Sequence, residues 1–125
     1  MGTLAHQVAN PTDEAIMNLS VTVVIPTYGR EETRDALQSI ANQTRPPEEI
    51  LVVDEDLNSP VMKVMAELSF HRETTVRHIQ RECGGLTRAK NFAAERASGD
   101  IVVYLDDDAV LENDAIENLL DVYET

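Results

Sequence analysis

The chain of 125 residues has the length of one domain and is long enough to bury a single hydrophobic core. Its 23 acidic residues outnumber the 10 basic ones, and the net charge of −13 argues against nucleic acid and anionic membrane surfaces as partners. Only two basic residues are lysines, Lys63 and Lys90. We interpret this acidic, lysine-poor composition as adaptation to high salt, where ions screen the self-repulsion.

The sequence offers no sign of a membrane span or a secretory signal. No apolar run is long enough to cross a bilayer, and no basic region precedes an apolar one at the N-terminus. A single cysteine, Cys83, excludes an internal disulfide and is typical of a reducing compartment, so we expect a cytoplasmic protein. Residues 1–19 are polar and aperiodic, which predicts a flexible or docking segment ahead of a domain at residues 20–125.

Strands and helices are predicted to alternate from residue 20 onward. Continuous apolar runs indicate strands at residues 21–25 (closed by Pro26), 50–53, 74–79 and 101–105. Helical spacing of apolar residues indicates helices at residues 30–43, from 60 to about 68, from about 86 to 97, and from about 113 onward. The strand at 74–79 carries Arg77 and His78, which places it nearer a sheet edge. Gly99 is predicted to end the third helix in the left-handed conformation.

This alternation predicts the fold class. Strands that alternate with helices form a mostly parallel sheet covered by helices on both faces, with right-handed crossovers. We therefore expect a three-layer, Rossmann-like α/β domain.

Three consecutive aspartates, Asp106, Asp107 and Asp108, directly follow the last predicted strand. Open α/β sheets bind ligands at the carboxyl ends of their strands. Adjacent carboxylates repel one another unless a cation or solvent relieves them, and Mg²⁺ and Mn²⁺ prefer oxygen ligands shared with phosphates. The motif predicts a metal–diphosphate site. Taken alone, it leaves an acidic solvated turn open as the alternative.

Other polar segments follow the other strands. PTYGR at residues 26–30 follows the first strand, and Asp54-Glu55-Asp56 follows the second. Two glycines at residues 84–85 precede the third helix, whose first N–H groups can hold an anion. Arg88 and Lys90 lie in the first turns of that helix, within reach of a diphosphate. Because the carboxyl ends of parallel strands meet at one edge, one crevice can gather these groups.

Three stretches together resemble a known family. They are VTVVIPTYGR at 21–30, EEILVVDED at 48–56 and GGLTRAKNFAAERASGDIVVYLDDDAV at 84–110. In order and spacing the chain resembles the nucleotide-binding half of a family 2 glycosyltransferase of the GT-A fold. The resemblance implies a nucleotide-diphosphate-sugar donor, with a UDP-sugar favoured, and a divalent metal cofactor, Mn²⁺ or Mg²⁺.

The resemblance also implies roles for single residues. Tyr28 and Pro26 would frame the base, and Asp54 would accept the N–H of a uracil-like ring. Asp106 and Asp108 stand where the family's D-x-D acids stand, with Asp108 as the first metal ligand and Asp106 as the second. Asp107 or Asp106 would meet the ribose or a metal-bound water. The remaining nucleotide-sugar contacts are assigned to Arg30, Asp56, Arg88 and Lys90, and Lys90 stands where the family often has arginine.

The implied reaction is an inverting glycosyl transfer, in which an acceptor hydroxyl attacks the anomeric carbon and a metal stabilises the diphosphate leaving group. The family's catalytic base and acceptor region follow the D-x-D strand, where this sequence has one more helix. No base is therefore assigned, and whether the domain transfers a sugar on its own stays open.

Two other functions stay open at this point. A non-catalytic nucleotide-binding or split-subunit module would self-associate, or pair with a partner chain, through an open sheet edge. A nucleotidyltransferase would need a longer, glycine-rich loop after the first strand. The turn Glu55-Asp56-Leu57-Asn58 also departs from the acid-glycine-serine turn that is usual in the family.

Overall fold

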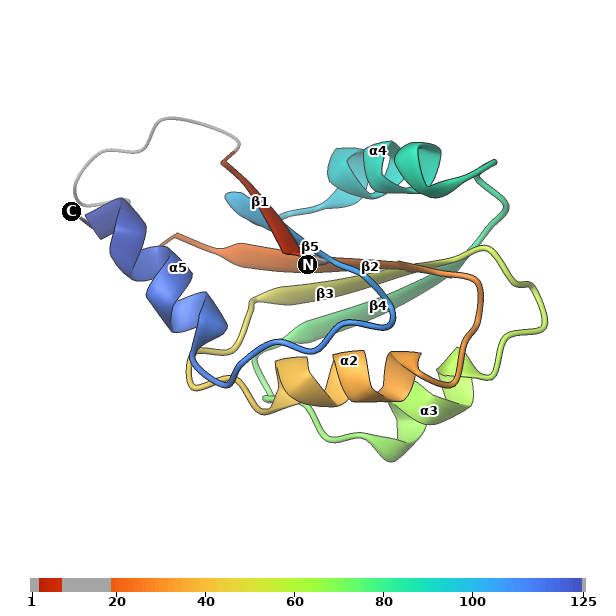
Figure 1. Cartoon of the computed structure of the whole chain (residues 1–125), viewed down its shortest axis with the longest axis horizontal. Helices are drawn as coiled ribbons and strands as arrows, with labels where there is room; N and C mark the ends of the chain where they lie inside the picture. The colour runs from red at the N-terminus through yellow and green to blue at the C-terminus, as the bar shows by residue number, and fades with distance from the viewer. Residues whose placement is uncertain (1–2, 8–18, 125) are drawn as a thin grey trace.

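A computed structural model describes residues 3–7 and 19–124 of the chain (Figure 1). Its middle layer is a five-stranded sheet of order β1-β5-β2-β3-β4. The strands are β1 (Thr3–Gln7), β2 (Val21–Thr27), β3 (Glu49–Asp54), β4 (Thr75–Gln80) and β5 (Ile101–Leu105). The helices are α2 (Thr33–Ala41), α3 (Val61–Glu67), α4 (Leu86–Arg96) and α5 (Ala115–Glu124). Strands β2 to β5 are parallel, whereas β1 pairs antiparallel with β5.

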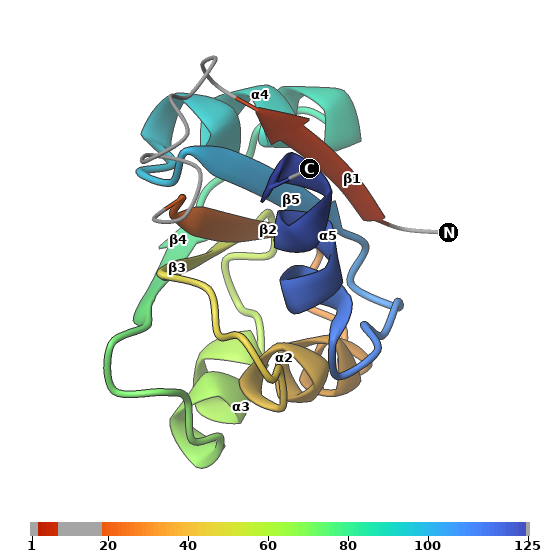
Figure 2. The ribbon, with the colours of Figure 1, turned by 90° about the vertical axis from the view of Figure 1, so that its left-hand side faces the viewer.

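Helices cover both faces of the sheet, which confirms the predicted three-layer α/β architecture. Helix α4 packs on one face, and α2, α3 and α5 pack on the other (Figures 1 and 2). Strands β2 and β3 are buried along their whole length, so their apolar runs are continuous rather than alternating. Strand β4 lies at the edge, as its charged residues predicted. No described helix is long and apolar enough to cross a membrane.

Pro26 lies inside β2 rather than closing it, and pairs with Val53 of β3. Strand β5 pairs with β2 only as far as Val24, so nothing on that side requires the N–H that proline lacks. The expectation for Gly99 was wrong, because its φ is not positive. Gly99 is required for another reason: a Cβ there would lie 2.6 Å from the backbone nitrogen of Thr22. Leu86, the first residue of α4, is 49% exposed.

Strand β1 was not predicted from the sequence. It pairs with β5 from Thr3 opposite Leu105 to Gln7 opposite Ile101. Residues 8–18, most of the segment predicted to be flexible, lie outside the described residues. Because β1 takes the edge of β5, the outer sides of β1 and β4 are the edges that remain in the described sheet. Pairing with a partner chain through a sheet edge stays a prediction.

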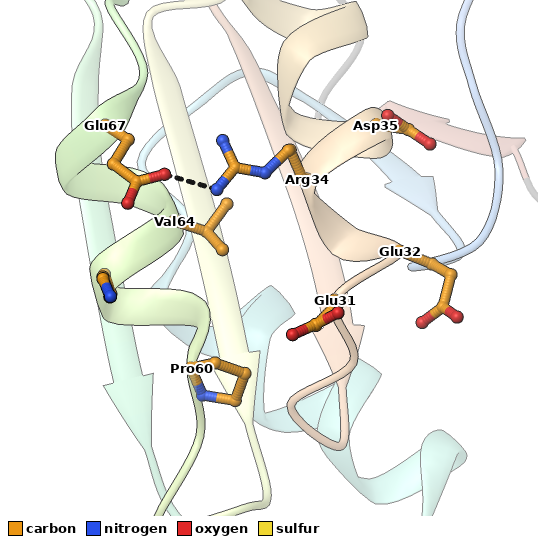
Figure 3. Close-up of a pocket in the computed structure, with 8 residues that line it drawn as sticks. Glu31, Glu32, Arg34, Asp35, Pro60, Val64 and Glu67 are labelled. Carbon is orange, nitrogen blue, oxygen red and sulfur yellow. Dashed lines mark hydrogen bonds and ion pairs between the residues drawn. The ribbon is translucent and has the colours of Figure 1, made fainter.

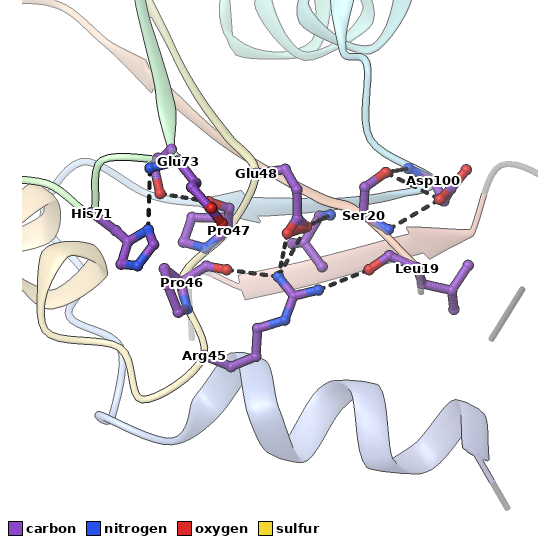
Figure 4. A network of polar contacts seen from close by, with 11 residues as sticks. Leu19, Ser20, Arg45, Pro46, Pro47, Glu48, His71, Glu73 and Asp100 are labelled. Atoms are coloured by element: carbon purple, nitrogen blue, oxygen red, sulfur yellow. Dashed lines mark hydrogen bonds and ion pairs between the residues drawn. The ribbon is translucent and has the colours of Figure 1, made fainter. Parts of the chain in front are cut away.

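Polar contacts close the amino end of the sheet (Figure 4). Arg45 donates to the carboxylate of Glu48 at 2.6 and 2.9 Å and to the carbonyl of Leu19 at 2.9 Å. Glu48 in turn accepts the N–H of Val21 at 2.7 Å. These contacts fix where β2 begins. They also pair the polar groups at this end of the sheet with one another.

Candidate functional site

The loops after β2, β3 and β5 enclose a cavity of about 240 Å³ at the carboxyl edge of the sheet. Six of the predicted site residues line it, together with Thr27, Glu55 and Leu86: Pro26, Tyr28, Arg30, Asp106, Asp107 and Asp108. A wider open hollow of about 650 Å³ shares Tyr28 and Glu55 with this cavity and extends to Arg88. The fold therefore gathers the strand-end residues at one edge.

Asp107 is held by the loop after β2. Its Oδ2 accepts a hydrogen bond from the Thr27 hydroxyl at 2.8 Å, and its Oδ1 lies 3.8 Å from the Arg30 guanidinium. Its side chain is only 13% exposed. Within the described part of the chain, the carboxylates of Asp106 and Asp108 accept no hydrogen bond. Asp107 is thus held by the loop after β2, whereas Asp106 and Asp108 are not held by any described residue.

Asp54 lies behind the cavity wall, and its side chain is 0% exposed. Its Oδ2 is 2.9 Å from Nε2 of His78, and its Oδ1 accepts the N–H of Asp56 at 3.0 Å. The other ring nitrogen of His78, Nδ1, is buried and has no hydrogen-bond partner among the described residues. Both carboxylate oxygens of Asp54 are therefore engaged within the chain, and its base contact stays a prediction.

Glu55 occupies the N–H groups of the turn that directly precedes α4. Its Oε1 accepts from the backbone N–H of Cys83 at 2.8 Å, Gly84 at 2.9 Å and Gly85 at 3.4 Å. Partial burial raises the pKa of Glu55, but these N–H groups and the Tyr28 hydroxyl outweigh it and hold the pKa below its ordinary value. The hydrogen bond to Glu55 also raises the pKa of the Tyr28 phenol.

The two basic residues of α4 lie differently from each other. The ammonium of Lys90 lies 5.5 Å from the centre of the Tyr104 ring, on the α4 face of the sheet, and Lys90 is not among the residues that line the cavity. Arg88 is exposed and forms no ion pair with a described residue. Arg88 is therefore the α4 cation that borders the site. Asp56 lies at the cavity rim, packed against Gly29.

A second hollow, of about 550 Å³, lies between α2 and α3 (Figure 3). Mostly charged side chains line it, and an ion pair between Arg34 and Glu67 crosses it. Hydrogen bonding from Arg34 lowers the pKa of Glu67. The hollow contains none of the carboxylates that follow β3 or β5, so we place the candidate site in the smaller cavity.

Sequence reasoning gave no role to Thr27, Glu55 or His78. Thr27 and Glu55 lie within the segments that the sequence singled out, so their position after a strand was the available signal. The contact of His78 depends on sheet register. His78 pairs with Val52, which brings its side chain to the face of β3 that also carries Asp54.

Comparison with known proteins identifies the family. A sequence model described as "Glycosyl transferase family 2" matches residues 22–125. The chain belongs to this family. The expected resemblance is thereby confirmed.

Two curated relatives illustrate the family match. The glucosyl-dolichyl phosphate glucuronosyltransferase of Haloferax volcanii is 31% identical over 109 residues, which cover 85% of this chain and 34% of the relative. Glycosyltransferase GlyA of Streptococcus pneumoniae is 34% identical over 103 residues, which cover 79% of this chain and 14% of the relative. The chain thus spans a third or less of the length of these family members.

Solved structures agree on the fold. Staphylococcus aureus TarS in complex with UDP-GlcNAc superposes with a TM-score of 0.69 at 22% identity, over 82% of this chain and 30% of the TarS chain. The TarS complex with UDP gives a TM-score of 0.67 at 23% identity, over 82% of this chain and 31% of the TarS chain. The structure of this chain is therefore GT-A-like.

Proposed function

We propose that this family 2 domain binds a nucleotide-diphosphate sugar through a divalent Mn²⁺ or Mg²⁺ ion, for glycosyl transfer to an acceptor hydroxyl. The observation that carries the proposal is the division among the three aspartates. Asp107 is bonded to Thr27 and lies near Arg30, whereas the carboxylates of Asp106 and Asp108 line the cavity without a partner among the described residues. Two free carboxylates fit a hard cation that takes its other ligands from phosphate and water.

The charge of the site supports the need for a cation. Four carboxylates line the cavity, from Glu55 and residues 106–108, against one guanidinium from Arg30. No described group of three or more His, Cys, Asp or Glu side chains is already arranged to hold a metal. Asp108 and Asp106 are the residues that would hold such an ion. When bound, such an ion neutralises the diphosphate as it leaves.

Several residues support the nucleotide end of the proposal. The Tyr28 ring is 59% exposed beside Pro26, which leaves its face open to stack on a base. Arg30 and Arg88 border the cavity and the adjoining hollow, where their guanidinium groups can pair with phosphate oxygens. The UDP-GlcNAc complex of TarS, whose fold this chain shares, supports a uridine nucleotide as the favoured donor.

Binding and transfer are separate parts of the proposal. No described residue is assigned as the catalytic base that would deprotonate the acceptor hydroxyl. Asp114 and Glu117 follow the acidic motif in the sequence. Both are exposed, and neither lines the cavity. The alternative of a non-catalytic nucleotide-binding or split-subunit module makes the same prediction for binding and differs only in transfer.

Calorimetric titration tests the binding proposal. UDP, GDP and dTDP are titrated with and without Mn²⁺, at low and at molar KCl, into the wild type, Asp108→Ala and Asp114→Ala. Asp114→Ala removes the same charge from an exposed position away from the cavity and serves as the control. We expect UDP binding that requires Mn²⁺, is lost in Asp108→Ala and persists in Asp114→Ala. A folded wild type that binds no nucleotide under any condition, or an Asp108→Ala variant that binds normally, would refute the proposal.

A further inference from the structure

The turn before α4 has the geometry of an anion site that is already filled. Gly84 and Gly85 have positive φ values of 85° and 120°, and no side-chain hydrogen bond caps α4. Successive N–H groups in such a turn converge on one point, where they favour a negative charge. The point is occupied by Glu55, whose Oε1 accepts from the N–H groups of residues 83, 84 and 85.

Glu55 also joins this turn to the other loops of the site. Its backbone N–H donates to the Thr27 carbonyl at 2.9 Å, which fixes it to the end of β2. Its carboxylate lies in the same cavity wall as Tyr28 and raises the pKa of the Tyr28 phenol. One side chain thus links the loop after β2, the loop after β3 and the turn before α4.

From these contacts we propose that Glu55 is a positioning residue of the nucleotide site. It fixes the turn at residues 83–85 and the direction of the Tyr28 ring. Because it fills the anion site with a carboxylate of the chain itself, it keeps the donor diphosphate off the N–H groups of residues 83–85 and on the side of Asp106 and Asp108. This inference rests on the proposed nucleotide function.

A structural consequence distinguishes this role from that of a simple surface acid. With Glu55 in place, a phosphate at the turn of residues 83–85 meets a negative charge and N–H groups that already donate to Glu55. Removal of the carboxylate exposes three converging N–H groups beside the Arg88 guanidinium, which is an arrangement that binds anions. Loss of Glu55 should therefore weaken the base end of the site and create a phosphate site that needs no metal.

Cys83 provides a probe of the turn that requires no nucleotide. It is the only cysteine of the chain, and burial together with the nearby Glu55 charge raises the pKa of its thiol. The rate of Cys83 alkylation by iodoacetamide is compared in the wild type, Glu55→Ala, Glu55→Gln and Glu82→Gln. Glu55→Gln keeps an oxygen that can accept the N–H groups. Glu55→Gln therefore measures the effect of the Glu55 charge on the thiol, and Glu82→Gln, which removes a neighbouring exposed charge, serves as the control.

We expect Glu55→Ala to alkylate about tenfold faster than the wild type, as the loss of hydrogen bonds to a charged acceptor implies. The alkylation rate of Glu55→Gln should lie between those of the wild type and Glu55→Ala, because this variant loses the charge that raises the thiol pKa but keeps an acceptor for the turn. Circular dichroism confirms that each variant is folded. Equal rates in Glu55→Ala and Glu55→Gln would overturn the claim that the Glu55 hydrogen bonds hold the turn.

Binding measurements then test the effect on the nucleotide site. UDP is titrated with Mn²⁺, and inorganic pyrophosphate is titrated without metal. We expect Glu55→Ala to lose roughly tenfold in UDP affinity and to gain metal-free pyrophosphate binding that the wild type lacks, while Glu82→Gln changes neither. An unchanged UDP affinity in Glu55→Ala would overturn the positioning role. If the wild type binds no UDP, the proposed function is refuted, and the Cys83 rates still decide whether Glu55 holds the turn.

Discussion

Gly29 is the residue at which the fold and the candidate site depend most directly on each other. It follows Tyr28 in the loop after β2 and has a φ of +81°, a conformation that residues with a Cβ rarely adopt. A Cβ at this position would lie 2.7 Å from Oδ2 and 2.9 Å from Cβ of Asp56, and 2.8 Å from Oγ of Ser59. Gly29→Ala would therefore strain the backbone and push apart the two loops that carry Tyr28 and Asp56.

The two costs can be sized separately. The left-handed backbone costs about 1–2 kcal/mol in a residue with a Cβ. The overlap adds about 1–3 kcal/mol, because the Cβ of Asp56 cannot rotate away as the end of a flexible side chain can. The free energy of unfolding should therefore fall by about 2–5 kcal/mol, a large share of the roughly 5–15 kcal/mol that stabilises a typical domain. At about 4 °C for each kcal/mol, the melting temperature should fall by roughly 8–20 °C.

Gly84→Ala provides the matched control, since its φ of +85° is nearly the same. The nearest atoms that a Cβ would meet there belong to the flexible Arg88 side chain, at 3.3 and 3.5 Å. Gly84→Ala should therefore show the backbone cost alone, a loss of about 1–2 kcal/mol. Urea unfolding of both variants measures the difference. If Gly29→Ala is no less stable than Gly84→Ala, the close approach of the two loops is not a constraint and the reasoning fails.

Three further predictions follow from the contacts and the charge. Burial raises the pKa of Glu49, but hydrogen bonds from Ser98, Thr22 and Arg77 outweigh burial and lower the pKa. The ionised Glu49 side chain therefore stabilises the fold above its ordinary pKa of 4.5, and this stabilisation is lost as the pH falls through the lowered pKa. Glu49→Gln should cost about 1–3 kcal/mol in urea unfolding at pH 7, and the difference from wild type should shrink below pH 4.5; a constant difference would contradict this. Thr27→Val removes the donor to Asp107 together with the hydroxyl's bonds to Thr33 and to the Gly29 N–H, so it should cost at least about 0.5–1.5 kcal/mol and weaken Mn²⁺-dependent UDP binding; unchanged melting and affinity would exclude a role for this hydroxyl. Because the net charge is −13, the melting temperature should rise between low and molar KCl, and a fall would refute the high-salt interpretation.

The buried strands could be predicted because burial on both faces leaves a local signal. Strands β2, β3 and β5 are continuous apolar runs, and the structure places each within one or two residues of its expected bounds. Strand β1 has no such signal, since its sequence TLAHQ is short and its partner β5 lies at the other end of the chain. Gly99 was misjudged for the same reason. The need for glycine arises from Thr22, which approaches only in the folded sheet.

The candidate site divides in a similar way. Topology alone brings the ends of β2, β3 and β5 to one edge, so the residues that line the cavity could be expected from the sequence. The sequence could not predict which of these side chains form hydrogen bonds within the chain. The pairing of Asp54 with His78 depends on the register of β3 against β4, and the capture of three N–H groups by Glu55 depends on the path of the turn before α4.

These engagements explain why the acidic edge of the sheet can fold at all, and where its remaining charge lies. Most carboxylates that follow β3 and β5 are compensated by donors of the chain itself: Asp54, Glu55, Asp56 and Asp107. Asp106 and Asp108 have no such donor among the described residues and line the same cavity. Like charges held close together favour a cation between them. The uncompensated negative charge at this edge of the sheet is therefore concentrated at Asp106 and Asp108, where a metal-bound diphosphate is proposed. A cation added there relieves the repulsion between these carboxylates and does not compete with the contacts that hold the loops.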